Sequence, residues 1–219
     1  MHSKWIKSVL VAAMMIAGGA AQATVVATDA GYVNFDGNTG IRTLNVTAHG
    51  TILDANLSIE FSKCDDPAMG PLGSACIGTG NSNNNEIVFR LISPNGTVVN
   101  LADAGTYTGS RPGAGRVLVT FDDEAALPVG GPAAAGTFRP VGALSAFDGM
   151  DMFGTWGLFI QDLRTGDPLE YFSSSLDITF DAGVTGPAPV PEPASLAIVG
   201  LGLLAIRAVR GKVRARPAD

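Results

Sequence analysis

The sequence is short of the side chains that most enzymes and metal sites use. Its 219 residues include two histidines and two cysteines, and charged residues make up 16% of the chain. Once the N-terminal segment is set aside, His49 is the one histidine on which a Ser-His-Asp triad could depend. The hydrolase motifs G-x-S-x-G and H-E-x-x-H are both absent from the sequence. We therefore expect no enzymatic activity, and interpret His49, beside Gly50, as a hydrogen-bonded turn residue.

Long apolar runs are also missing, although apolar residues make up 46% of the chain, enough for a packed core. The 28 glycines and 13 prolines favour short strands joined by turns. Seven of the 14 basic residues lie in the two ends, which leaves the middle of the chain acidic. An acidic surface argues against nucleic acid as a partner. It is compatible with calcium, or with a solvated surface outside the cytoplasm.

The N-terminus has the three parts of a secretory signal peptide. Lys4 and Lys7 precede a short apolar run, Ser8–Gly19, and a small-x-small cleavage site follows. We predict a signal peptide over residues 1–23, cut by signal peptidase; an uncleaved membrane anchor is the alternative. The residues that define the cut are Ala21, Ala23 and Thr24.

The C-terminus carries a second topology signal. A Gly/Pro/Ala linker, residues 184–190, leads to Pro191, Glu192 and Pro193, and then to the apolar run Leu196–Ile206. We predict a short transmembrane helix over 194–209, although about 20 residues are normally needed to cross a bilayer. Arginines after the run place its end in the cytoplasm by the positive-inside rule, so the linker faces the periplasm. They are Arg207, Arg210, Arg214 and Arg216, with Lys212 among them.

This order of Pro-Glu-Pro, short apolar helix and arginine-rich end resembles the PEP-CTERM sorting signal of Gram-negative bacteria, over residues 191–219. The resemblance implies that exosortase, a membrane-embedded cysteine protease, recognises Pro191, Glu192 and Pro193 and cuts at or near them. Two prolines hold the backbone extended and remove hydrogen-bond donors, which keeps such a segment accessible. A plain single-span anchor is the alternative. We expect export through the inner membrane, transient anchoring with a periplasmic domain, and release to the cell surface or outside.

The middle of the chain, residues 24–183, has a period of two. Its clearest strand is Ile52–Phe61, where Leu53, Ala55 and Leu57 alternate with polar residues. The turn Ser93–Gly96 joins two further strands. We predict an all-β domain, a jelly-roll β-sandwich of about eight strands. The other predicted strands are Thr43–Ala48, Ile87–Ile92, Thr97–Leu101, Arg116–Phe121, Trp156–Gln161 and Ser175–Phe180.

The cysteines, Cys64 and Cys76, lie in one loop after the Phe61 strand. In an exported chain an even pair predicts a disulfide; two free thiols are the alternative. A zinc site is disfavoured because no further Cys or His has the required spacing.

A series of motifs follows in a fixed order through the middle of the chain: Glu86–Thr97, Val119–Ala125, Gly136–Pro140, Leu144–Gly149, Gly154–Asp162 and Ser175–Phe180. Their succession resembles the P domain, or Homo B domain, of proprotein convertases and bacterial subtilisin-like proteases. The resemblance runs from about Thr43 to Phe180 and implies a jelly-roll sandwich that stabilises a neighbouring catalytic domain. The chain departs from that family: it has no room for a protease domain, it has a longer loop, Ser62–Asn85, and Pro168 follows Gly166-Asp167 where the family often has glycine.

Adjacent carboxylates provide the candidate metal site. Three acidic side chains in a row repel one another unless a cation or hydrogen bonds offset the repulsion, and calcium suits exported domains. The ends of strands in a sandwich lie close together, so we predict that acidic residues at these ends form a calcium site, with Asp151 as a further contributor. A solvated acidic loop is the alternative. We interpret Trp156 as core, with a sugar-stacking platform as the alternative. The predicted calcium ligands are Asp122, Asp123, Glu124, Asp148 and Asp162.

These features predict an exported surface or extracellular-matrix protein whose β-sandwich contacts polysaccharide, other proteins or itself. Two alternatives from other classes remain. One is a module that stabilises a separately encoded subtilisin-type protease, and the other is a calcium-dependent carbohydrate-binding module.

Overall fold

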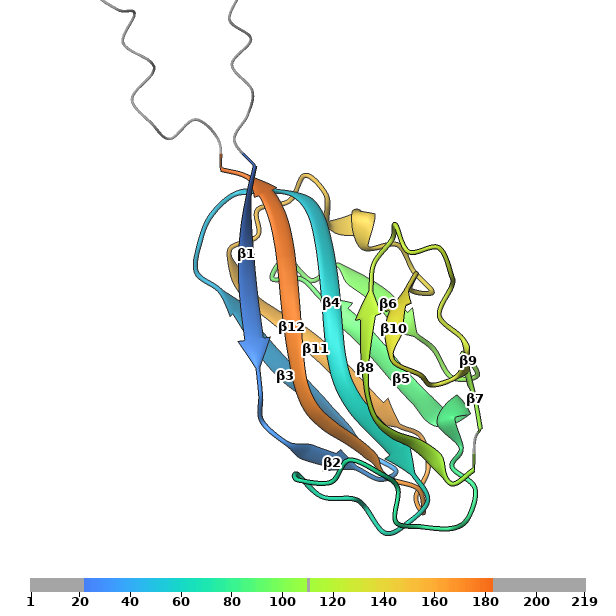
Figure 1. Cartoon of the computed structure of the whole chain (residues 1–219). Coiled ribbons are helices and arrows are strands. Elements are labelled where there is room, and N and C mark those ends of the chain that lie inside the picture. The colour runs from blue at the N-terminus through green and yellow to red at the C-terminus, as the bar shows by residue number, and fades with distance from the viewer. Residues whose placement is uncertain (1–21, 110, 183–219) are drawn as a thin grey trace, which may run out of the picture. The chain divides into compact units, whose positions relative to one another are not determined.

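The computed structural model describes residues 22–109 and 111–182 (Figure 1). Apart from Gln22 and Ala23, the predicted signal peptide lies outside these residues, as do the linker, the sorting motif and the C-terminal helix. Within them the chain forms twelve strands and two short 3-10 turns, η1 (Asn84–Glu86) and η2 (Leu144–Phe147). The all-β prediction is confirmed. No helix of the described ranges is long and apolar enough to cross a bilayer.

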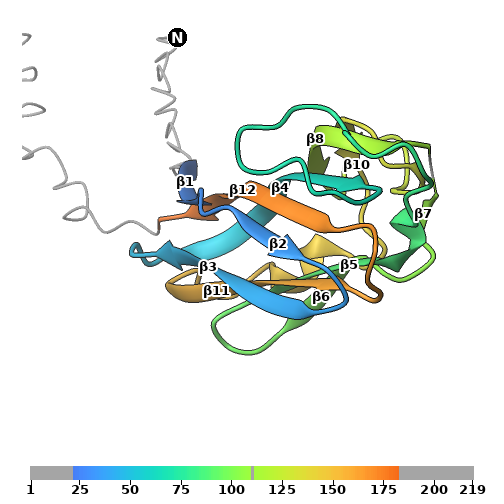
Figure 2. The same cartoon turned by 90° about the horizontal axis from the view of Figure 1, so that it is seen from below.

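The strands form two main sheets, which lie as separate layers in Figure 2. The six-stranded sheet has the order β1 (Gln22–Asp29), β12 (Leu169–Asp181), β4 (Thr51–Cys64), β8 (Gly113–Phe121), β10 (Gly136–Phe138), and β2 (Val33–Phe35) also pairs with β12. The four-stranded sheet has the order β3 (Thr39–Val46), β11 (Gly154–Asp162), β5 (Ile87–Ile92), β6 (Val98–Ala102). Two short strands, β7 (Tyr107–Thr108) and β9 (Gly131–Pro132), pair separately.

The core lies between the two sheets and is built from the inward positions of each strand. Phe61 on β4 and Phe89 on β5 meet edge-on across the layers, with ring centroids 5.1 Å apart. Trp156 on β11 is fully buried, packs edge-on against Phe147 at 4.9 Å, and donates its indole N–H to the carbonyl of Met152. The interpretation of Trp156 as core is confirmed. A buried indole cannot serve as a sugar platform, so that alternative is wrong.

The alternation predicted for β4 fails at one residue. Ala55, Leu57, Ile59 and Phe61 are buried as expected, but Leu53 is 40% exposed and Ile52 is buried instead. The pairing of β4 with β12 shifts between Thr179 and Phe180, which leaves Leu53 without its own partner. Such a bulge reverses which face the following residues occupy.

The predicted strands are present, and most extend further than the alternation indicated. Ile87–Ile92 matches β5, and the turn after it is closed by a hydrogen bond from the Gly96 N–H to the Ser93 carbonyl. Strand β1 was not predicted. It begins at Gln22, so the predicted cut before Thr24 lies within this strand. The five strands that the alternation missed are β1, β2, β7, β9 and β10.

The two ends of the described chain leave the domain side by side (Figure 1). Strand β1 pairs with β12 along its whole length, and Gln22 lies opposite Asp181. The first and last strands of the described chain therefore begin and end at the same end of the sandwich.

The bulge predicts a contrast between two leucines of β4. We expect Leu57→Ala to lower the free energy of unfolding by about 2–5 kcal/mol, because it leaves a cavity in the core. Leu53→Ala should cost less than about 1 kcal/mol, because this side chain already contacts solvent. Urea unfolding of the two variants measures the difference, and equal losses would place Leu53 in the core.

Candidate functional site

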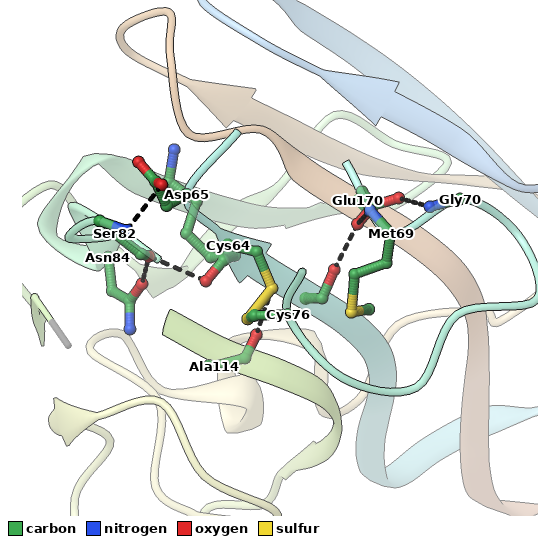
Figure 3. Close-up of a disulfide and its surroundings, with 12 residues drawn as sticks. Cys64, Asp65, Met69, Gly70, Cys76, Ser82, Asn84, Ala114 and Glu170 are labelled. Carbon is green, nitrogen blue, oxygen red and sulfur yellow. Dashed lines mark hydrogen bonds between the residues drawn. A yellow bond between two sulfur atoms is a disulfide. The ribbon is translucent and has the colours of Figure 1, made fainter. Parts of the chain in front are cut away.

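The disulfide loop, residues 65–83, lies in the connection from β4 to β5. It is shorter than the predicted loop Ser62–Asn85, because β4 continues to Cys64 and η1 begins at Asn84. Cys64 ends β4 and is bonded to Cys76, with the two Cα atoms 5.4 Å apart (Figure 3). The predicted disulfide is therefore confirmed. Cys64 is fully buried, so the bond ties the loop to the inner end of the strand.

Glu170 holds the first half of this loop from β12. Its buried carboxylate accepts hydrogen bonds from the backbone N–H groups of Met69 at 2.9 Å and Gly70 at 2.7 Å (Figure 3). The hydroxyls of Ser62 and Tyr32 donate to the same carboxylate at 3.0 Å and 2.6 Å. Burial and the Glu170 carboxylate raise the pKa of Tyr32. Four donors to one buried acid fix the loop without a further ligand.

Asp65 and Ser82 hold the second half of the loop. The Gly80 N–H donates to the Asp65 carboxylate at 2.8 Å, and a Cβ on Gly80 would lie 2.6 Å from that carboxylate, so a larger residue there would displace the Asp65 side chain. The Ser82 hydroxyl donates to the Lys63 carbonyl at 2.8 Å. The loop is therefore closed onto the end of β4 by a covalent bond and by backbone contacts.

A buried charged cluster lies beneath this loop: Lys63, Glu86, Asp162 and Asp167, which we call the Lys63 cluster. The Lys63 side chain is 0% exposed, and its ammonium lies 2.8 Å from Asp162 Oδ2, 3.2 Å from Asp167 Oδ1 and 3.8 Å from Glu86 Oε2. It also donates to the Asp167 carbonyl. Arg164, which is exposed, reaches Glu86 at 3.6 Å.

The carboxylates of this cluster are shifted in the direction that burial dictates. Burial raises the pKa of Asp162, and the nearby Lys63 partly opposes the rise. Burial also raises the pKa of Glu86, and the negative charge of Asp167 adds to that rise. Buried ionised groups are costly even when paired, so the protonated forms of both acids become more accessible than in water.

The Lys63 cluster was missed by the sequence reasoning, yet one signal was present. Lys63 follows Leu57, Ile59 and Phe61 at intervals of two, so it shares their inward phase on β4. A lysine in that phase needs acidic partners inside the domain.

The predicted calcium ligands do not all come together. Asp162 belongs to the Lys63 cluster, where an ammonium group supplies the positive charge, so its inclusion with the other ligands is wrong. Asp151 also lies apart, since its carboxylate bonds the ring of His49 at 2.7 Å. Lys63 and Asp54 are nine positions apart on β4, on the order of 30 Å at about 3.3 Å per residue. That strand separates the Lys63 cluster from the remaining acids.

The remaining acids gather around Asp54, a residue that the sequence reasoning did not include. Burial raises the pKa of Asp54, and Asp122 and Asp123 add to the rise. Burial raises the pKa of Asp148, and Asp54 contributes to it. The hydrogen bond to Asp122 is the main cause of the raised pKa of Glu124.

Backbone contacts satisfy part of this acidic group. The Asp123 carboxylate accepts hydrogen bonds from the N–H groups of Leu144 and Ser145, at 2.9 Å and 2.8 Å, and Asp122 accepts one from Glu124. No group of three or more Asp, Glu, His or Cys side chains in residues 22–109 and 111–182 has the arrangement of a metal site. Calcium binding stays a prediction.

His49 lies at the opposite end of the domain from the disulfide loop, beside the two chain ends. Its ring stacks on Phe153 with centroids 4.2 Å apart, and its Nδ1 contacts Asp151 at 2.7 Å. Thr51, two residues on, bridges to Asp151 and pairs with Asp181. His49 is thus a hydrogen-bonded turn residue, as interpreted from the sequence.

The acidic group around Asp54 predicts a pH-dependent gain from removing one charge. The raised pKa values mean that the folded chain binds protons more readily than the unfolded chain. The contribution of this proton binding to the free energy of unfolding is therefore present below about pH 4 and is lost as pH rises. We expect Asp54→Asn to raise the melting temperature by about 1–3 °C at pH 7 and to have no effect near pH 3.5.

The matched control is Asp103→Asn, since Asp103 accepts a hydrogen bond from Asn100 and an asparagine can accept it too. Differential scanning calorimetry at the two pH values measures the effect, and a lower melting temperature for Asp54→Asn at pH 7 would contradict it.

The effect of calcium on the melting temperature provides a second test. A rise in melting temperature with calcium that Asp122→Asn/Asp123→Asn abolishes would show that a cation offsets the repulsion.

Comparisons with solved structures give low similarity. The crystal structures of the serine protease of Aeromonas sobria, alone and in complex with the chaperone ORF2, are each 12% identical to the chain, with TM-scores of 0.37 and 0.38. Each match covers 73% of this chain and 27% of the other, so the chain spans about a quarter of their length. The structure of infectious bursal disease virus Gt strain gives a TM-score of 0.29 at 12% identity, covering 75% of this chain and 33% of that one. These values do not identify the fold family, and the P-domain resemblance stays a prediction.

Comparison with curated proteins finds no match. Residues 189–214 match the family model of the PEP-CTERM protein-sorting motif. The motif covers the predicted recognition residues and the apolar run after them. It supports an exported protein that is sorted at its C-terminus by an exosortase-type system in the membrane.

Proposed function

We propose that the chain is a cell-surface or extracellular-matrix protein whose β-sandwich is a non-catalytic interaction domain. A signal peptide directs export, and the C-terminal tail holds the domain at the membrane until a cut at or near Pro191–Pro193 releases it. The match of residues 189–214 to the sorting motif is the observation that carries this proposal.

The pairing of the domain's two ends supports this route. A signal peptide before cleavage and a sorting tail after synthesis both enter the membrane from the periplasmic side. A folded domain between them must then present both ends to the same membrane surface. Gln22 and Asp181 lie opposite each other in one antiparallel ladder, which meets this requirement.

The composition of the tail supports a temporary anchor. The apolar run Leu196–Ile206 is shorter than the roughly 20 residues of a comfortable membrane helix, and basic residues follow it directly. A short helix costs little to withdraw once the chain is cut on its periplasmic side. We therefore assign Pro191, Glu192 and Pro193 to recognition rather than to catalysis.

The polar side chains of the domain support a non-catalytic role. Glu170 and Asp65 bond the backbone of the disulfide loop. Between residues 24 and 183 the chain has 18 acidic and seven basic residues, a net charge of −11. A surface of that sign favours cationic partners or polysaccharide bridged by cations, and resists non-specific association with acidic polymers.

Sorting predicts a defined set of chain ends. We expect the released protein to begin at Thr24 and to lack the arginine cluster, because both membrane segments are removed. Intact-mass analysis of protein from the producing cells measures both ends. A full-length tail on exported protein would contradict the proposal.

The recognition residues can be tested directly. The variant Pro191→Ala/Glu192→Ala/Pro193→Ala should stay in the membrane fraction with its tail attached, as should the unchanged protein in cells that lack the sorting protease. Pro187→Ala, in the linker before the motif, is the matched control and should be processed normally. Normal release of the triple variant would exclude a role for these residues.

A further inference from the structure

The Lys63 cluster joins three parts of the fold at one buried point. Lys63 is near the end of β4 in the six-stranded sheet, Asp162 ends β11 in the four-stranded sheet, and Glu86 ends η1. The Lys63 and Asp162 side chains are both 0% exposed, and 2.8 Å separates the Lys63 Nζ from Asp162 Oδ2. An amine and a carboxyl group are therefore held in contact, away from solvent, across the two layers of the sandwich.

Glu86 is placed to carry protons between the Lys63 amine and the Asp162 carboxyl group. Its Oε2 lies 3.8 Å from the Lys63 Nζ, is buried, and has no hydrogen-bond partner among the described residues. A buried carboxylate oxygen without a donor is costly for the fold and is a feature that calls for an explanation. Asp162 is also close enough to raise the pKa of Glu86 by its negative charge. A carboxyl group beside both reacting side chains can act as a general acid and base when small side-chain movements bring it into hydrogen-bond contact.

We propose that Lys63 and Asp162 condense into an intramolecular amide, an isopeptide bond, with Glu86 as the proton carrier. The ion pair first becomes a neutral amine and a neutral carboxylic acid by transfer of a proton from Nζ to Asp162. The Nζ lone pair then attacks Cγ of Asp162, and Glu86 accepts a proton from the nitrogen. Glu86 returns that proton to the departing hydroxyl of Asp162, which leaves as water.

All the atoms and protons of this condensation are accounted for within the Lys63 cluster. One N–C bond forms and one C–O bond breaks, one water molecule is released, and Glu86 ends in the state in which it began. No oxidant, metal or activated co-reactant is needed. Proximity replaces activation, because the reacting groups are fixed in contact and excluded from solvent.

Backbone groups favour Asp162 over Asp167 as the acyl partner. The Leu169 N–H donates to Asp162 Oδ2 at 3.2 Å, where it would stabilise the negative charge of a tetrahedral intermediate. Asp167 Oδ1 is farther from Nζ, at 3.2 Å, and the other oxygen of Asp167 accepts from the Asn83 N–H. Asp162 is also held in a regular strand, whereas Asp167 lies in the connection between β11 and β12.

The bond would join the two sheets covalently and close a segment of 99 residues, next to the Cys64–Cys76 disulfide. A covalent link between strands of different sheets prevents the layers from separating. Outside the cell, where refolding assistance is absent, such a link protects against proteases and mechanical load.

The experiment is an intact-mass measurement on the full chain after reduction of the disulfide. We expect a mass lower than that of the sequence by one water molecule, after allowance for the chain ends. In a tryptic digest, residues 43–90 with Lys63 uncleaved should be joined to residues 117–164. The full sequence mass would overturn the proposal. So would a link from Lys63 to the peptide that begins at Thr165, because that peptide contains Asp167.

Two variants separate the role of Glu86 from a general effect on folding. Glu86→Gln keeps Lys63 and Asp162 but cannot relay the proton, so this variant should retain the water and yield the two peptides unlinked. Glu170→Gln is the matched control, because Glu170 is also buried but bonds Tyr32, Ser62 and the loop backbone; it should still lose the water. Equal bond formation in both variants would remove Glu86 from the mechanism.

Discussion

The pairing of β4 with β12 is the constraint on which the rest of the domain depends. The ladder runs from Thr51 opposite Asp181 to Lys63 opposite Leu169, on the order of 40 Å at about 3.3 Å per residue. Strand β1 pairs beside one end of it, which brings the two chain ends together. The disulfide loop leaves from the other end. One antiparallel ladder therefore sets both where the described chain begins and ends and where its longest loop lies.

The far end of this ladder concentrates charge inside the fold. Lys63 lies on the inward-facing side of β4, so its ammonium group needs acidic partners inside the domain. The four-stranded sheet and its connections supply them through Asp162, Asp167 and Glu86. Apolar residues of similar volume would often give equal or greater stability at such a site. The Lys63 cluster therefore contributes little stability as ion pairs alone, and this is the setting in which we propose the amide bond.

Period-two alternation was sufficient to predict the all-β class and the positions of the main strands, because those strands bury one face. The alternation could not predict features that depend on how one strand pairs with another. Leu53 faces solvent because of a bulge that only the pairing with β12 reveals. Strand β1 was hidden because it overlaps the predicted signal cleavage site. Local sequence also could not divide the acids between the Lys63 cluster and the group around Asp54, since that division follows from register. The disulfide was predictable because the export signal fixed its chemistry.

The placement of the disulfide loop has a consequence for where a partner can bind. Gln22 and Asp181, near the two ends of the described chain, pair at one end of the sandwich. The disulfide loop is at the opposite end of β4, and Glu170, Asp65 and the disulfide fix its backbone before any partner arrives. A preordered loop loses little conformational entropy on binding. Contacts within the domain therefore set the backbone of this loop, and a partner that binds the loop need not order it first.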